Sequence, residues 1–204
     1  MLAGEYTLKL IVDGKEVMRK PLTIEEDPRI QLSLAEAKAR VEFLLAVNKL
    51  QRSGTEGQNR LSALRSQLAS LRDNLNKQEP KPEALLAAVA KVLQDVIDAQ
   101  NRLSPQINRA GMAAESAGPA DEATLALQDA AMRKVSRLFD ELDLYTEPVS
   151  AKQRSQLPKR TVAMNSLIDQ INRLVTETVP NLNRQIEAAG LSPLKAGETV
   201  APVQ

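Results

Sequence analysis

The chain has 204 residues, 43% of them hydrophobic and 26% charged, which is enough for one well-buried domain of ordinary globular composition. Its formal net charge of +1 excludes a global electrostatic field that would attract nucleic acid or anionic lipid. Aromatic residues make up only 2%, and neither Cys nor His occurs, which excludes base-stacking platforms, disulfides, thiolate nucleophiles and the usual zinc sites.

Residues 5 to 25 are predicted to form a β-hairpin. From Tyr6 to Val12, apolar residues recur at every second position, and Asp13-Gly14 is typical of a type I′ turn. The return strand ends near Ile24 and contains Pro21, which cannot donate to a sheet ladder and therefore indicates an edge strand.

Two strands alone are only marginally stable in water, so this hairpin needs another surface to pack on. It could dock on the helices that follow. It could also be the last two strands of a β-sandwich whose other strands are not in this sequence, and we favour this second interpretation.

After Asp27-Pro28 the apolar period changes to about 3.5, and Ser33 to Glu36 form a predicted capping box. A first apolar stripe is assigned to Leu34, Ala37, Val41, Leu44/Leu45 and Asn48, and a second to Leu61, Leu64, Leu68, Leu71 and Leu75. Gly54 and Gly57 lie between the two stripes. Residues 34–77 could therefore form one helix of roughly 65 Å or two helices with a break.

Further helical stripes follow, separated by prolines. The first contains Leu85, Val89, Val92, Val96, Ala99 and Leu103, and the second contains Leu125, Met132, Val135, Phe139 and Leu142. The region from Gly111 to Pro119 is predicted to be a loop. The last stripe, after a capping box at Ser150 to Gln153, contains Met164, Leu167/Ile168, Ile171, Leu174/Val175, Leu182 and Ile186.

Local breaks are also predicted within and after this last helix. Pro158 and Pro180 each predict a kink or short break, and Gly190 a helix end. Residues 195–204 have neither a strand nor a helix period and are predicted to be loose. The predicted fold is mainly α, an antiparallel bundle of about four long helices preceded by a short β-hairpin. We divide it into a hairpin at 1–29, a bundle at 30–190 and a flexible tail at 191–204.

Signals for chemistry are sparse, and we assign no catalytic, cofactor-binding or metal-ligating residue. The acidic groups at 25–27, at Asp140-Glu141 and at Asp143 lie at predicted turns and helix faces, where solvated charge is the simpler explanation. Asn-Arg recurs at 59–60, 101–102, 108–109, 172–173 and 183–184. These pairs could form a shared polar seam, although solvated helix faces are the favoured interpretation. No apolar run reaches the length of a membrane span.

The two ends of the chain carry a recognisable pattern. It consists of Gly4-Glu5-Tyr6-Thr7-Leu8-Lys9-Leu10-Ile11-Val12-Asp13-Gly14-Lys15, then Pro21-Leu22-Thr23-Ile24 with Asp27-Pro28-Arg29, and finally Val179-Pro180-Asn181-Leu182-Asn183-Arg184 with Ala188-Ala189-Gly190-Leu191. This pattern resembles the C-terminal region of bacterial sortilin-like, Asp-box (BNR-repeat) β-propeller proteins, often labelled glycosyl hydrolases. There, an Ig-like sandwich and a helical tail domain follow a large propeller. The resemblance implies that the hairpin is the end of the sandwich, with Tyr6 at a tyrosine corner.

The resemblance also implies an extracellular or periplasmic location, although Met1 to Glu5 do not have the features of a signal peptide. No Asp-box occurs in this sequence, so hydrolase activity of such a protein would lie elsewhere. We therefore expect a non-catalytic structural or interaction module whose partner is the upstream propeller and Ig-like region. One alternative is a self-assembly element that pairs through the seam from Leu61 to Leu75. Another is part of a glycoside hydrolase whose active site lies outside this chain.

Overall fold

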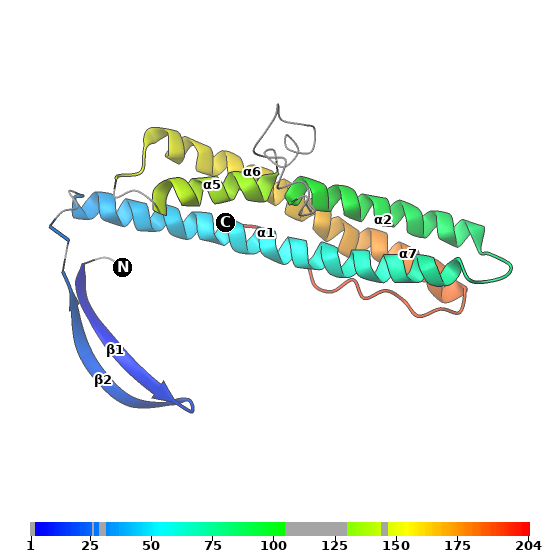
Figure 1. Ribbon diagram of the computed structural model, residues 1–204, viewed down its shortest axis with the longest axis horizontal. Coiled ribbons are helices and arrows are strands. Elements are labelled where there is room, and N and C mark those ends of the chain that lie inside the picture. The colour runs from blue at the N-terminus through cyan, green and yellow to red at the C-terminus, as the bar shows by residue number, and fades with distance from the viewer. Residues whose placement is uncertain (1–2, 26, 29–31, 105–129, 144–146) are drawn as a thin grey trace, which may run out of the picture.

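The structure is a computed structural model that describes residues 3–25, 27–28, 32–104, 130–143 and 147–204. Of the described residues, 67% are helical, and a two-stranded hairpin precedes the helices, so the predicted mainly α fold class is confirmed (Figure 1). The strands are β1 (Gly4–Val12) and β2 (Lys15–Ile24). The helices are α1 (Leu34–Leu75), α2 (Glu83–Leu103), α5 (Ala131–Asp143), α6 (Ala151–Arg173) and α7 (Val179–Ala188), with a π-helical turn, η2 (Leu174–Thr178), between the last two.

Helix α1 is continuous over 42 residues and begins at the predicted capping box. The Ser33 hydroxyl accepts the backbone N–H of Glu36, whose carboxylate accepts the N–H of Ser33. Because two free N–H groups at the helix start are satisfied in this way, the helix begins sharply at this point.

The two glycines of α1 lie inside the core instead of breaking the helix. Gly54 contacts Met132 and Met164, and Gly57 contacts Leu103 and two isoleucines of α6. They continue the seam of buried positions at alternating spacings of 4 and 3, which runs through Phe43, Val47, Leu50, Gly54, Gly57, Leu61, Leu64 and Leu68. The seam ends at Leu75, seven residues further on, and the partly buried Leu71 lies between. The alternative of two separate helices is therefore wrong.

The first predicted stripe of α1 is only partly correct: Ala37, Val41 and Leu44 are partly buried, and Leu44 packs on the core. Leu34 and Leu45 are 48% and 59% exposed, and Asn48 is exposed as well. The buried side chains here are Phe43 and Val47, because the seam extends backwards from Leu61 with the same 4 and 3 spacing. The stripe assigned from Leu34 onwards follows a neighbouring face of the helix.

Helices α2 and α5 pack on different halves of α1. Leu103, at the end of α2, contacts Gly57, and Met132, at the start of α5, contacts Gly54. At the other end of α5, the backbone carbonyl of Leu142 accepts a hydrogen bond from Arg40. Both helices thus run antiparallel to α1, one after the other, while α6 and α7 run parallel to α1 (Figure 1). The predicted loop at 111–119, Leu125 and the Asn-Arg pair at 108–109 lie outside the described residues.

The apolar stripes of the later helices are confirmed wherever the structure describes them. The predicted stripe residues of α2 are all buried, and so are Val135 and Leu142 of α5. Together with the buried residues of α1, α6 and α7 they form one continuous core. No helix in the described ranges is long and apolar enough to cross a membrane.

The two prolines near the chain's end behave differently. Helix α6 begins at its predicted capping box and continues through Pro158, so of the predicted kink or short break the break is wrong. Before Pro180 the structure has the π-helical turn η2. The buried positions Ile171, Val175 and Val179 are spaced by 4 and 4 instead of 4 and 3. The π turn accommodates this additional residue and keeps the apolar face of α7 on the core.

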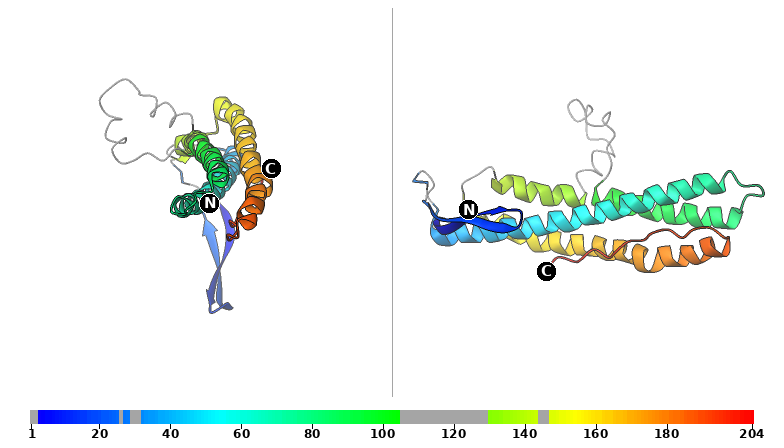
Figure 2. Two further views of the ribbon diagram at one scale, coloured as in Figure 1. Left: turned by 90° about the vertical axis from the view of Figure 1, so that its right-hand side faces the viewer. Right: turned by 90° about the horizontal axis from the view of Figure 1, so that it is seen from below.

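The end of α7 is the predicted one, but the segment after it differs from the prediction. Gly190 has a φ of +73°, and Gly190 and Leu191 donate their N–H groups to the carbonyls of Glu187 and Ile186, which is a Schellman motif. Residues 191–204, the tail, then run back along the bundle in Figure 2. They are held there by hydrogen bonds to helix side chains, so the expectation of a loose tail is wrong.

Candidate functional site

The β-hairpin is the part of the molecule with the least packing against the helical bundle. Asp13 and Gly14 have φ values of +50° and +76°, as a type I′ turn requires, so the predicted turn is confirmed. The strands pair in antiparallel register from Gly4 with Ile24 to Val12 with Lys15, and Val17 is the additional residue of a β-bulge. The structure describes no third strand in this sheet.

The register divides the hairpin into two different faces. Opposite pairs such as Tyr6 with Leu22 and Leu10 with Met18 place most of the apolar side chains on one face. The pairs of the other face are mostly polar, and Glu5 there accepts a hydrogen bond of 2.9 Å from the Thr23 hydroxyl. One face thus resembles the inner face of a sandwich and the other a solvated surface.

Charges on the polar face are paired both along β2 and between the strands. The Arg19 Nε donates to Glu16 over 2.8 Å, and the Lys9 Nζ lies 3.7 Å from the same carboxylate. The hydrogen bond to Glu16 raises the pKa of Arg19 above its ordinary value. All three side chains are well exposed, so these pairs mark the solvent side of the sheet more than they stabilise it.

The apolar face is uncovered. Leu8 is 62% exposed, Leu10 and Met18 are each 50% exposed, and Val12 is 49% exposed. The hairpin projects away from the bundle near the start of α1 (Figure 1), and neither strand makes extensive contact with a described helix. In the described part of the chain, the hairpin is therefore not docked on the helices. A contiguous apolar face of this kind is the usual signature of an interaction site.

The two free edges of the hairpin are not equivalent. In β1, which has no bulge, the N–H and C=O groups of alternate residues point to β2, beginning with Val12 beside the turn. The backbone N–H and C=O groups of Thr7 therefore point away from β2, and the backbone nitrogen of its partner Pro21 points away from β1. Because proline has no N–H, the outer edge of β2 is interrupted there, whereas the outer edge of β1 has no proline. The β1 edge is thus the one that can accept another strand along its whole length.

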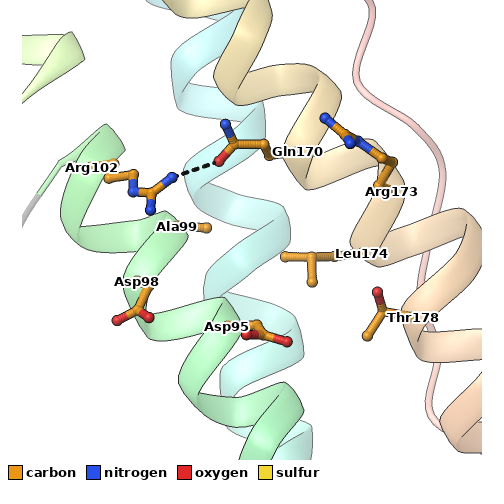
Figure 3. A pocket seen from close by; sticks show the side chains of 8 residues that line it. All are labelled: Asp95, Asp98, Ala99, Arg102, Gln170, Arg173, Leu174 and Thr178. Atoms are coloured by element: carbon orange, nitrogen blue, oxygen red, sulfur yellow. Dashed lines mark hydrogen bonds between the residues drawn. The ribbon is translucent and has the colours of Figure 1, made fainter.

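A second candidate, a polar groove, lies between α2 and the junction of α6 with η2 (Figure 3). It has a volume of about 430 Å³ and is lined by Asp95, Asp98, Ala99, Arg102, Gln170, Arg173, Leu174 and Thr178. Arg102 reaches across it and donates a hydrogen bond of 3.0 Å to Gln170. Both aspartates are exposed. A glycosidase needs one desolvated carboxyl group, and this open groove does not provide that environment.

The polar residues singled out in the sequence fall into distinct environments. Glu25, Asp140 and Glu141 are exposed, while Glu26 and the side chain of Asp143 lie outside the described part of the structure. Among the described residues, no group of three or more acidic side chains could hold a metal ion.

The Asn-Arg pairs also divide into two classes. Asn59 and Asn101 are exposed, as expected for solvated helix faces. Asn172 and Asn183 are partly buried, and each pairs with the backbone of the tail. For these two the predicted solvated face is wrong. The alternative prediction was a polar seam between helices. Asn172 and Asn183 do not form such a seam, because their partner is the tail and not another helix.

Comparison of the chain with protein-family models, with curated proteins and with solved structures finds no match.

Proposed function

We propose that this chain is a non-catalytic structural and interaction module that uses its hairpin to join a β-sheet supplied by another part of a larger protein. The observation that carries the proposal is the uncovered apolar face of a hairpin whose opposite face is polar and charge-paired. Leaving several large apolar side chains in water is costly, and burying each one contributes about 1.5–3 kcal/mol.

The uneven edges specify how the partner would bind. A partner strand adds beside β1, at residues Glu5, Thr7 and Lys9, where the outward backbone groups are available along the edge. A second sheet then covers the apolar face. This arrangement agrees with the order of strands in an Ig-like sandwich, in which the second-last strand lies inside its sheet and the last strand lies at the edge. The resemblance to sortilin-like propeller proteins leads to the same partner, the upstream region of a secreted bacterial protein.

Self-assembly through the leucine seam of α1 is the less favoured alternative. In this structure, Leu61, Leu64 and Leu68 are fully buried within the chain, so they offer no surface to a second copy. A hydrolase whose active site lies outside this chain remains compatible with the module proposed here, because the module itself needs no catalytic residue.

The test is hydrogen exchange of the hairpin amides. In the isolated chain at low micromolar concentration, we expect the N–H groups of Leu8 and Leu10 to exchange at least about a hundredfold faster than those of Leu64 and Leu68, because a two-stranded sheet opens easily. When the coding region upstream of Met1 is included in the expressed protein, the hairpin amides should become as slow as the core amides. Equal protection in the isolated monomer would overturn the proposal, and so would an upstream region without β-strands.

A further inference from the structure

The tail lies in a groove between α1 on one side and α6 to α7 on the other, and its backbone is held by a row of side-chain amides. Asn165 and Asn172 lie seven residues apart on α6, Asn183 lies on α7, and Gln67 lies on α1. All four bind the tail in the same manner.

Each amide makes two hydrogen bonds to one tail residue. Asn172 donates to the carbonyl of Val200 over 2.9 Å and accepts its N–H over 2.8 Å. Asn183 makes the same pair with Leu194, at 2.9 and 2.8 Å, and Asn165 with Val203, at 2.9 Å in both directions. Gln67 pairs in this way with Lys195, at 3.1 and 2.8 Å. An amide side chain that satisfies both backbone groups of one residue recognises the extended backbone and not the side chain.

The side chains of the tail repeat with a period of three. Leu191, Leu194, Val200 and Val203 are buried or partly buried, and Ser192, Pro193, Thr199 and Pro202 are exposed. Ala196 is also partly buried, and it is the exception to this period. Three residues per turn is the period of an extended polyproline-II-like segment, which rises about 3.1 Å per residue. Three such residues span about 9 Å, close to the rise of about 10.5 Å over seven residues of an α-helix. The Asn165 and Asn172 amides are therefore spaced to meet successive anchors of the tail.

Gly197 occupies the remaining position of this period. Its φ is +76°, and a Cβ there would overlap the guanidinium of Arg60. The groove thus prefers glycine between the anchors Leu194 and Val200. On the α1 side, the buried Ser53 hydroxyl donates to the carbonyl of Ala201 over 3.1 Å.

We propose that this groove is a binding site for an extended peptide with the pattern Leu-x-x-Gly-x-x-Val-x-x-Val, and that the tail is its occupant. The tail occupies the groove in cis, within its own molecule. The amide pairs and the apolar anchors supply the binding, and the covalent connection at Gly190 raises the local concentration of the peptide. This site is separate from the hairpin and does not depend on the function proposed for it.

The experiment keeps the full chain through folding. A specific protease site is inserted between Ser192 and Pro193, which are both exposed, and the folded protein is then cleaved. The released segment, residues 193–204, should dissociate on dilution while the helical circular dichroism signal is retained. A fluorescent peptide of residues 193–204 should then bind the emptied groove saturably, measured by anisotropy.

Matched variants test the mode of recognition. Asn172→Asp cannot donate to the Val200 carbonyl, so it should weaken peptide binding by at least about tenfold. Asn101→Asp, at an exposed site in another Asn-Arg pair, should leave binding unchanged. In the peptide, Val200→Asp should weaken binding by at least about tenfold, whereas the exposed Thr199→Asp should not.

Three results would overturn the proposal. Loss of the helical signal when the segment leaves would make the tail an integral part of the core. A segment that never exchanges with the labelled peptide would show that the groove is not a reversible site. Equal affinities of the Asn172→Asp and Asn101→Asp proteins would show that the amide row does not recognise the peptide.

Discussion

Gly57 offers a direct test of how closely the helices approach α1. It occupies a position of the buried seam at which the alternating 4 and 3 spacing would normally place a large apolar residue. The sequence pattern alone therefore suggests that Gly57→Leu would stabilise the bundle. The structure leads to the opposite expectation. An added Cβ would lie 3.0 Å from Ile171 Cδ1, 3.2 Å from Ile168 Cδ1 and 3.4 Å from Leu103 Cδ2, and no space remains for the rest of the leucine.

The magnitude follows from two opposing terms. Replacing glycine inside a helix gains up to about 1 kcal/mol in helix propensity. Forcing additional methyl groups into a packed core costs about 1–3 kcal/mol and occasionally more. For Gly57→Ala the two terms nearly cancel, and we expect the free energy of unfolding to change by less than about 1 kcal/mol. For Gly57→Leu we expect a net loss of about 2–3 kcal/mol, because three further carbon atoms have no space.

Urea unfolding followed by circular dichroism at 222 nm measures both changes. With an m-value of about 2–3 kcal/mol per M, Gly57→Leu should lower the midpoint by about 1 M. Ala63→Leu is the matched control, since Ala63 is exposed on the same helix, and it should change stability by less than about 0.5 kcal/mol. If the Gly57→Leu protein is as stable as the control, the close approach of α2 and α6 to α1 is incorrect.

Three further predictions concern the core, the first cap and the hairpin. Leu68→Ala should lower the unfolding free energy by about 2–5 kcal/mol because Leu68 is fully buried, whereas Leu45→Ala, at a 59% exposed site, should change it by less than about 0.5 kcal/mol. Hydrogen bonds from the Ser33 hydroxyl, and then from its backbone N–H, hold the pKa of Glu36 below its ordinary value. The stabilisation from the ionised Glu36 is therefore complete above its unfolded pKa and is lost as the pH falls through the lower folded pKa. The difference in urea midpoint between the wild-type chain and Glu36→Gln should shrink accordingly below about pH 4. Leu8→Thr, on the uncovered face of the hairpin, should leave the unfolding midpoint of the bundle unchanged, and a clear decrease would mean that the hairpin packs on the helices.

The course of α1 was only partly predictable from the sequence. The capping box and the seam from Leu61 to Leu75 are local patterns, and both were predicted correctly. Glycine has two opposite meanings in a helical pattern, a break or a close contact, and the sequence of α1 alone does not distinguish them. The decisive information lies in Met132, Met164 and Ile171, which are far away in the chain and fill the space that the glycines leave.

The interpretation of the tail failed for another reason. Periods of 2 and about 3.5 identify strands and helices, and the tail has neither. Its period of three, from Leu194 to Val203, becomes meaningful only beside a helix that presents two asparagines seven residues apart. The π turn at Leu174–Thr178 could have been anticipated from the irregular spacing of Ile171, Val175 and Val179. The uncovered face of the hairpin follows from the alternation of apolar and polar residues, which was predicted. The preference for the β1 edge depends on the pairing register of the two strands.

The length of α1 has a mechanical consequence for a protein anchored through its hairpin. A helix of 42 residues is about 63 Å long, and the hairpin lies at one end of it. If the hairpin is fixed in a neighbouring sheet, the bundle acts as a lever arm. A tilt of about 10° at the anchor moves the opposite end, near Leu75, sideways by about 11 Å, which is the diameter of one helix. Small differences in how the hairpin is seated would therefore place the far end of the bundle at very different positions relative to whatever it is joined to.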